Sequence, residues 1–158
     1  MQINITINGA TELARALRDV AVDMKNLKPV LSESIDVIEE RKDEIFKTQG
    51  RNLEKSPAWK GLSATTTKAR SKRWGYYKKS PSNPGILRWT GNLQDNITKK
   101  SGDTSASMTF NADYAGYHQS GGGKLAKRAL IDLNEKTNEK IVKVFQKSVE
   151  KSLQQRLK

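Results

Sequence analysis

Residues 96–111, NITKKSGDTSASMTFN, decide the fold of this chain of 158 residues. Within them, Ala106, Met108 and Phe110 alternate with polar residues. This period of two is typical of a strand with one buried face. The preceding Ser101-Gly102-Asp103 has the composition of a tight turn. The sequence therefore predicts a β-hairpin with strands over residues 96–100 and 104–111.

The beginning of the chain shows the same period of two. Ile3, Ile5 and Ile7 alternate with polar residues over residues 2–8, and Gly9 ends the pattern. We expect a strand there, again with one buried face. Together with the hairpin it would give a small antiparallel sheet.

Long helical patterns lie on both sides of the hairpin. Thr11 can cap a helix whose apolar residues are spaced by four, three, four and three positions; they are Leu13, Leu17, Val20, Met24 and Leu27. Pro29 interrupts this pattern and a second one continues to about Gly50, which predicts either one long kinked helix or two consecutive helices. Residues 135–157 predict a final amphipathic helix.

Shorter helices are expected between these long ones. Ser63 can cap a helix that runs to about Lys72, Thr90 can cap a helical turn through Gln94, and residues 112–119 can form another. Amphipathic helices need an apolar surface to lie on. The chain is therefore predicted to be a single α+β domain over residues 1–158, in which long N- and C-terminal helices pack with a small antiparallel sheet.

Composition limits the chemistry that the chain can perform. Only 35% of the residues are apolar and 29% are charged, so we expect a lean core with surface left for partners. The chain has no cysteine and one histidine, which excludes disulfides, thiolate sites and a histidine-based metal cluster. No cofactor or metal is expected. Nothing resembles an export signal or the ~20 apolar residues of a membrane span, so no membrane partner is expected either.

Positive charge is concentrated in the middle of the chain. The net charge is +12, and residues 55–94 contain nine basic residues and no acidic one. Prolines, glycines and the lack of an apolar period predict a basic loop or arm over residues 55–84. Its basic side chains and rings are Lys68, Arg70, Lys72, Arg73, Trp74, Tyr76, Tyr77, Lys78 and Lys79. Such a set suits an interface with an assembly partner, contact with nucleic acid, or a solvated loop.

Two features that suggest an enzyme are incomplete. The glycines at 121–123 precede Lys124, but Leu125 stands where a phosphate-binding loop needs serine or threonine, so a flexible loop is favoured. His118 could act as a general base with Asp113, yet no nucleophile or third orienting group accompanies them. A structural role for His118 is therefore favoured over a hydrolase. We expect no catalytic residue and no small-molecule substrate.

Three blocks of sequence, in order, resemble the phage virion morphogenesis family of tailed bacteriophages and prophages. They are Trp59-Lys60-Gly61-Leu62-Ser63 with the threonines and basic residues that follow, the block from Ile86 to Ile97, ILRWTGNLQDNI, and Tyr114-Ala115-Gly116-Tyr117-His118-Gln119-Ser120-Gly121-Gly122. The residues that carry the likeness are Trp59, Leu62, Ser63, Leu87, Arg88, Thr90, Gly91, Leu93, Ile97, Tyr114, Ala115, His118, Gln119 and Gly121. The proline and aromatic run that often follows the glycine loop in this family is replaced here by residues 124–131.

The resemblance implies a tail-completion or head-tail neck protein without catalytic activity. Such a protein would assemble as a homo-oligomeric ring, with a hexamer favoured, in the cytoplasm of the bacterial host and would reside in the tail or neck of the virion. Its partners would be neighbouring head-tail connector or tail-tube proteins, with possible contact to DNA. Within the blocks, we assign the side chains of Leu93 and Tyr114 to the core.

The sequence therefore favours a structural virion assembly protein that acts through ring assembly and contacts with neighbouring proteins. The alternative is a nucleic-acid-binding accessory protein that uses the basic arm, residues 55–94. Steep salt dependence of DNA binding would favour the alternative.

Overall fold

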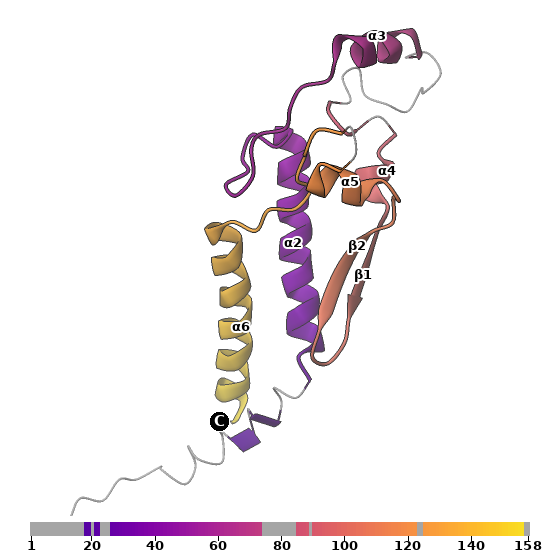
Figure 1. Ribbon diagram of the computed structural model, residues 1–158. Helices are drawn as coiled ribbons and strands as arrows, with labels where there is room; N and C mark the ends of the chain where they lie inside the picture. Colours follow the sequence, from indigo (N-terminus) through magenta and orange to yellow (C-terminus); the bar gives the residue numbers. More distant parts are fainter. Residues whose placement is uncertain are drawn as a thin grey trace, which may run out of the picture.

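The computed structural model describes residues 18–19, 21–22, 26–73, 85–88, 90–122 and 125–156, and its described part is an α+β fold as predicted. Figure 1 shows helix α2 (Lys28–Thr48) in the middle, with the hairpin on one side and helix α6 (Glu135–Arg156) on the other. Helix α3 (Ala64–Arg73) stands apart from this body, beyond the end of α2. The predicted strand over residues 2–8 and the cap at Thr11 lie outside the described residues.

The hairpin forms as the period of two predicted. Strands β1 (Ile97–Ser101) and β2 (Ala106–Phe110) pair antiparallel, with Ile97 opposite Phe110. The connection covers residues 102–105, because the Gly102 N–H donates to the Ser105 carbonyl at 2.8 Å. Thr104 therefore belongs to the loop and not to the second strand. The half-buried side of β2 faces α2, and β1 is tied to α2 through Lys99.

Lys99 joins β1 to α2 by two ion pairs. Its Nζ lies 2.8 Å from an oxygen of Asp36 and 2.7 Å from an oxygen of Glu39. Hydrogen bonds to the two carboxylates, that of Asp36 first, raise the pKa of Lys99 above its usual value. The ammonium therefore stays charged at any physiological pH.

Helix α2 begins anew and does not continue an earlier helix through a kink. Leu27 is not helical, and Pro29 lies in the first turn, where its missing N–H costs nothing. The Leu27 N–H donates to the Asp103 carbonyl at 2.9 Å. This bond fixes the start of α2 against the loop of the hairpin, so of the two predicted arrangements the structure supports separate helices.

The core lies where the C-terminal part of α2 meets α4, α5 and the irregular segments around Trp59 and Leu130. Its buried apolar residues are Ile45, Phe46, Trp59, Leu93, Ala112, Ala115 and Leu130. The rings of Phe46 and Trp59 meet edge to face, with centroids 5.3 Å apart. Gly50 has a φ of +72°, and a Cβ there would lie 2.3 Å from the Trp59 ring, so only glycine fits.

The burial of Leu93 confirms its predicted place in the core, since only 2% of its surface is exposed. It belongs to the short helix α4 (Asn92–Asp95), whose N-cap residue is Gly91 with a φ of +80°, and not the predicted Thr90. The Thr90 hydroxyl lies just before this cap and accepts a hydrogen bond from the Asn92 N–H at 3.3 Å.

The assignment of Tyr114 to the core is wrong, because 42% of its surface is exposed. Tyr114 precedes helix α5 (Ala115–Ser120), and the next residue, Ala115, is the one that turns inward and is buried. The Tyr114 ring instead packs edge to face on His118, with centroids 6.0 Å apart. Its hydroxyl accepts a hydrogen bond from the Asn92 amide at 3.5 Å.

The different burial of Leu93 and Tyr114 leads to losses of stability of different size for two alanine substitutions. Leu93→Ala should lower the free energy of unfolding by about 2–5 kcal/mol, because it empties a packed site. Tyr114→Ala should lower it by about 1 kcal/mol or less, because 42% of the residue's surface is already exposed. Urea denaturation of the two variants beside the parent measures both. Equal losses would contradict the described core.

Candidate functional site: an apolar groove and an uncovered helix face

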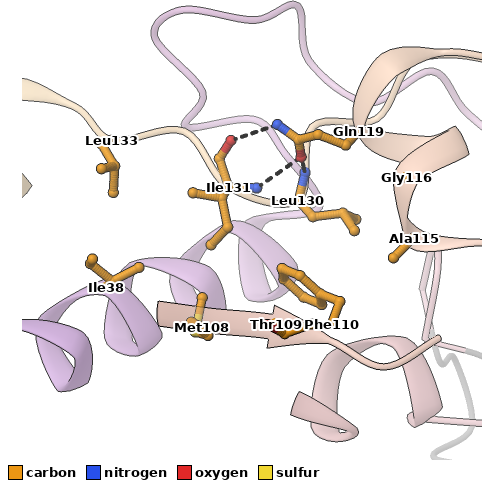
Figure 2. A pocket seen from close by; sticks show the side chains of 10 residues that line it. All are labelled: Ile38, Met108, Thr109, Phe110, Ala115, Gly116, Gln119, Leu130, Ile131 and Leu133. Carbon is orange, nitrogen blue, oxygen red and sulfur yellow. Dashed lines mark hydrogen bonds between the residues drawn. The ribbon is translucent and has the colours of Figure 1, made fainter. Parts of the chain in front are cut away.

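An uncharged groove of about 520 Å³ runs along strand β2. Figure 2 shows its floor formed by β2 and its far wall by an irregular segment at Leu130 and Ile131. Its lining residues are Ile38, Met108, Thr109, Phe110, Ala115, Gly116, Gln119, Leu130, Ile131 and Leu133. None of these side chains carries a charge, although the chain as a whole is strongly basic. The groove is therefore suited to an apolar, uncharged occupant.

Gln119 holds the two sides of the groove together. Its side-chain oxygen accepts hydrogen bonds from the N–H groups of Leu130 (2.7 Å) and Ile131 (3.3 Å), and its amide donates to the Ile131 carbonyl at 3.1 Å (Figure 2). The side chain thus pairs with backbone as a neighbouring strand would. This geometry gives a physical reason for glutamine at this position of the third sequence block.

The wall of the groove belongs to a segment that we call the strap, residues 128–134. The strap has no regular secondary structure, yet several of its residues are buried, so its polar groups need partners from elsewhere. One Asp132 carboxylate oxygen accepts the N–H groups of Glu54 and Lys55, each at 2.8 Å. The Asp132 carbonyl accepts from the buried Arg41 guanidinium at 3.0 Å.

The two ends of the strap are held in the same manner. At one end, the Arg128 guanidinium donates to the Lys60 carbonyl at 3.0 and 3.1 Å, and burial lowers the pKa of Arg128. At the other end, the Asn134 side chain caps α6 by accepting the Thr137 N–H at 2.9 Å. The Trp59 indole donates to the Ala129 carbonyl at 2.9 Å. Trp59, from the first sequence block, therefore supports the strap that forms the wall of the groove.

A second apolar surface lies on α6, away from the core. A shallow hollow there is lined by Ile141, Val142, Phe145, Gln146, Val149 and Glu150, all from this one helix. Val142 is 53% exposed, whereas the neighbouring Val144 is buried. The apolar seam predicted from the sequence is thus only partly covered within the described part of the chain. We call this surface the α6 face.

His118 is a buried residue whose ring lies against that of Tyr114. It is 9% exposed, and its Nδ1 has no hydrogen-bond partner among the described residues. Burial, and then the positive charge of Arg128, lower the pKa of His118 below the usual 6.5. The predicted partner Asp113 is exposed and does not orient the ring through that nitrogen. The structure brings no catalytic group together at this position in the described residues.

The basic arm is only partly described. Ser63 directly precedes helix α3 and its hydroxyl accepts the Thr66 N–H at 3.2 Å, so the predicted cap is confirmed. Lys68 is exposed, while Arg70 is half-buried and donates to the Gly85 carbonyl at 2.8 Å. Lys72 and Arg73 end the helix. The arm residues outside the described part are Trp74, Tyr76, Tyr77, Lys78 and Lys79.

The remaining block residues have structural positions. Leu87 packs against the core although its φ is +62°, and Arg88 and Leu62 are half-buried. Ile97 is half-buried at the start of β1. Gly121 ends α5 with a φ of +81°, and a Cβ there would lie 2.9 Å from the Lys127 side chain. These residues thus pack against the core or mark the ends of regular elements.

Sequence reasoning missed the buried polar residues that fix the site. Arg41 and Lys42 are both buried, and the Lys42 ammonium donates to the Gln94 carbonyl at 2.9 Å. Lys42 also lies 3.2 Å from an oxygen of Asp43. Their place in the helical period was a usable signal, because Arg41 and Lys42 adjoin the apolar positions Ile38 and Ile45.

The described residues contain no group of three or more metal-ligating side chains and no helix long and apolar enough to cross a membrane. Comparison of the chain with family models, curated proteins and solved structures found no match.

The buried imidazole predicts a pH dependence of stability. Because the folded-state pKa of His118 is lowered, the unfolded state binds a proton first as the pH falls. Stability should be complete above about pH 6.5 and should decrease as the pH falls from there to the folded-state pKa. His118→Phe should remove this dependence between pH 7.5 and 5.5. Urea midpoints across that range measure it, and NMR titration of the single histidine should give a midpoint below 6.5. A midpoint above 6.5 would contradict the burial.

Proposed function

We propose that this chain is a structural subunit of a tailed-phage or prophage virion, of the tail-completion or head-tail joining type. It acts by forming a ring and by contacting neighbouring connector or tail-tube proteins, and it catalyses no reaction. Its place is the tail or neck of the particle. The observation that carries the proposal is the α6 face, an apolar surface that the described part of the chain leaves uncovered.

A second copy of the chain would cover such a surface. Val142, Phe145 and Val149 lie along one stripe of α6, and exposed apolar stripes of this kind mark protein interfaces. Closed rings bury the same pair of surfaces around the whole assembly, so one stripe per subunit can contribute to every contact. The lean composition supports this, because subunits that complete one another need less core of their own.

The three sequence blocks support the particular class. Trp59, Leu93 and Gln119 come one from each block and together position the core and the strap. The likeness to the virion morphogenesis family therefore rests on residues with a physical role in this fold. It remains a resemblance of sequence pattern, and the class follows from it as a proposal.

An alternative is that the chain is a nucleic-acid-binding accessory protein. The observation that favours it is the position of α3, whose first residues are exposed on an element that stands away from the body (Figure 1). Lys68 on this helix and the basic residues after it could contact phosphates. Under the virion proposal the same arm docks on a neighbouring protein, where buried rings contribute more than exposed charges.

The virion proposal predicts self-assembly through α6. The parent should form a ring-sized species by mass photometry, and Val142→Glu should shift it towards the monomer by at least tenfold in dissociation constant. Because Val142 is exposed in the single chain, the variant should keep the parent's circular dichroism and urea midpoint. Lys143→Glu, which changes an exposed neighbour, is the matched control and should assemble as the parent does. A parent that stays monomeric at tens of micromolar would contradict the proposal.

The two functions differ in what the arm needs. If the arm docks on protein, alanine at Trp74, Tyr76 and Tyr77 should impair assembly, and Lys68→Glu with Lys72→Glu should not. If it binds DNA, the charge reversals should abolish binding and reduce the salt slope by roughly 0.9 per lost phosphate contact. DNA titration at three salt concentrations, beside mass photometry of the same variants, separates the two. The alternative would be favoured if the charge reversals abolish DNA binding while the alanine substitutions at the aromatic residues leave assembly unchanged.

A further inference from the structure

Strand β2 has an edge that no described residue pairs with. The Asn111 N–H donates to the Asn96 carbonyl, and the Gly102 N–H donates to the Ser105 carbonyl. Hydrogen-bonded pairs alternate in an antiparallel ladder, so β2 bonds to β1 through Ser107 and Thr109. The N–H and C=O groups of Ala106, Met108 and Phe110 therefore point away from β1. Among the described residues they have no hydrogen-bond partner.

This edge borders the apolar groove. Met108 and Phe110 line the groove with their side chains, beneath the strap (Figure 2). Proteins usually protect a sheet edge with charge, and the hairpin follows this rule on β1, which carries Lys99 and Lys100. Strand β2 carries no charged residue. Its edge thus offers both backbone hydrogen bonds and an apolar surface to an extended segment.

The chain itself contains a segment with the matching chemistry. Residues 2–8, QINITIN, carry no charge and place Ile3, Ile5 and Ile7 on one side of an extended chain. Seven residues are enough to pair with the five residues of β2. An uncharged strand with one apolar side fits a groove whose lining is uncharged.

The direction of the chain favours the groove of a neighbouring copy. Residues 18–19 and 21–22 lie beyond the start of α2, at the opposite end of the body from α5, which borders the groove (Figure 1). Residues 2–8 precede these residues in the chain, so the groove of a neighbouring copy is the acceptor that we consider.

We propose that residues 2–8 of one copy add to the β2 edge of a neighbouring copy as a third strand, with the isoleucines in the groove. This deepens the proposed function and rests on it, because it names one contact between subunits. The contact complements the α6 face, since it links copies through the edge of β2 that the described residues leave unpaired.

Engineered disulfides test the pairing directly, because the chain has no cysteine of its own. A chain with Ile3→Cys, Ile5→Cys or Ile7→Cys is co-expressed with a longer, tagged chain that carries Met108→Cys. At least one combination should give a disulfide-linked heterodimer on a non-reducing gel, because paired residues lie within disulfide range. Thr109→Cys is the matched control. Its side chain points to the other face, so it should give at least tenfold less product.

Amide exchange provides a second measurement on the assembled parent. The N–H groups of Met108 and Phe110 should be protected in the full chain and should exchange at least tenfold faster after deletion of residues 2–8. Those of Ser107 and Thr109, which pair with β1, should change little. These neighbours control for loss of the fold.

Three results would overturn the inference. Assembly of the parent without any heterodimer would remove the strand contact and leave the proposed function standing. A disulfide formed only within one chain, when both cysteines are placed in the same copy, would assign the segment to its own groove. A parent that remains monomeric would contradict both the strand contact between copies and the proposed ring.

Discussion

The fold depends on one constraint: the strap, residues 128–134, is irregular and partly buried, so its backbone N–H and C=O groups need hydrogen-bond partners from other segments. A strand or helix would satisfy its own N–H and C=O groups, but residues 128–134 have no such ladder. Side chains supply several of their partners, with Gln119 on one side and Trp59 and Arg41 on the other, and the His118 carbonyl accepts the Arg128 N–H at 2.7 Å. The strap therefore positions α5, α2 and the loop after α2 relative to one another. Leaving any of these buried groups unpaired would cost roughly 1–3 kcal/mol.

The hairpin and the long helices could be predicted from the sequence because their signals are local. In β2, apolar residues such as Met108 and Phe110 alternate with polar ones, and in α6 the apolar residues recur at the helical period. Both patterns depend only on nearby positions in the sequence. The strap could not be predicted in this way. Its sequence has no period, and its partners lie far away in the chain, as with Arg128 and Lys60. Polar contacts of such long separation leave no trace in one sequence.

The candidate site was predicted only in part. The blocks containing Trp59, Leu93 and Gln119 were identified, but the groove that they build was not. Tyr114 was placed in the core because it belongs to a block, although the helical period was a better guide. Ala115 and His118 are three positions apart and share the inward face of α5, which turns Tyr114 outward. In the basic arm, Arg70 supports the backbone at Gly85 as well as carrying charge, which the charge pattern alone did not indicate.

The backbone and packing of Leu87 limit which residues can replace it. Its backbone is left-handed, which costs roughly 1–2 kcal/mol for a residue with a Cβ, while its side chain packs on the core. Glycine would relieve the backbone but remove the packing, and a β-branched residue would keep the packing but add strain. Neither direction of change is neutral. An apolar, unbranched-at-Cβ side chain at this position is therefore a mark by which distant relatives with the same fold can be sought.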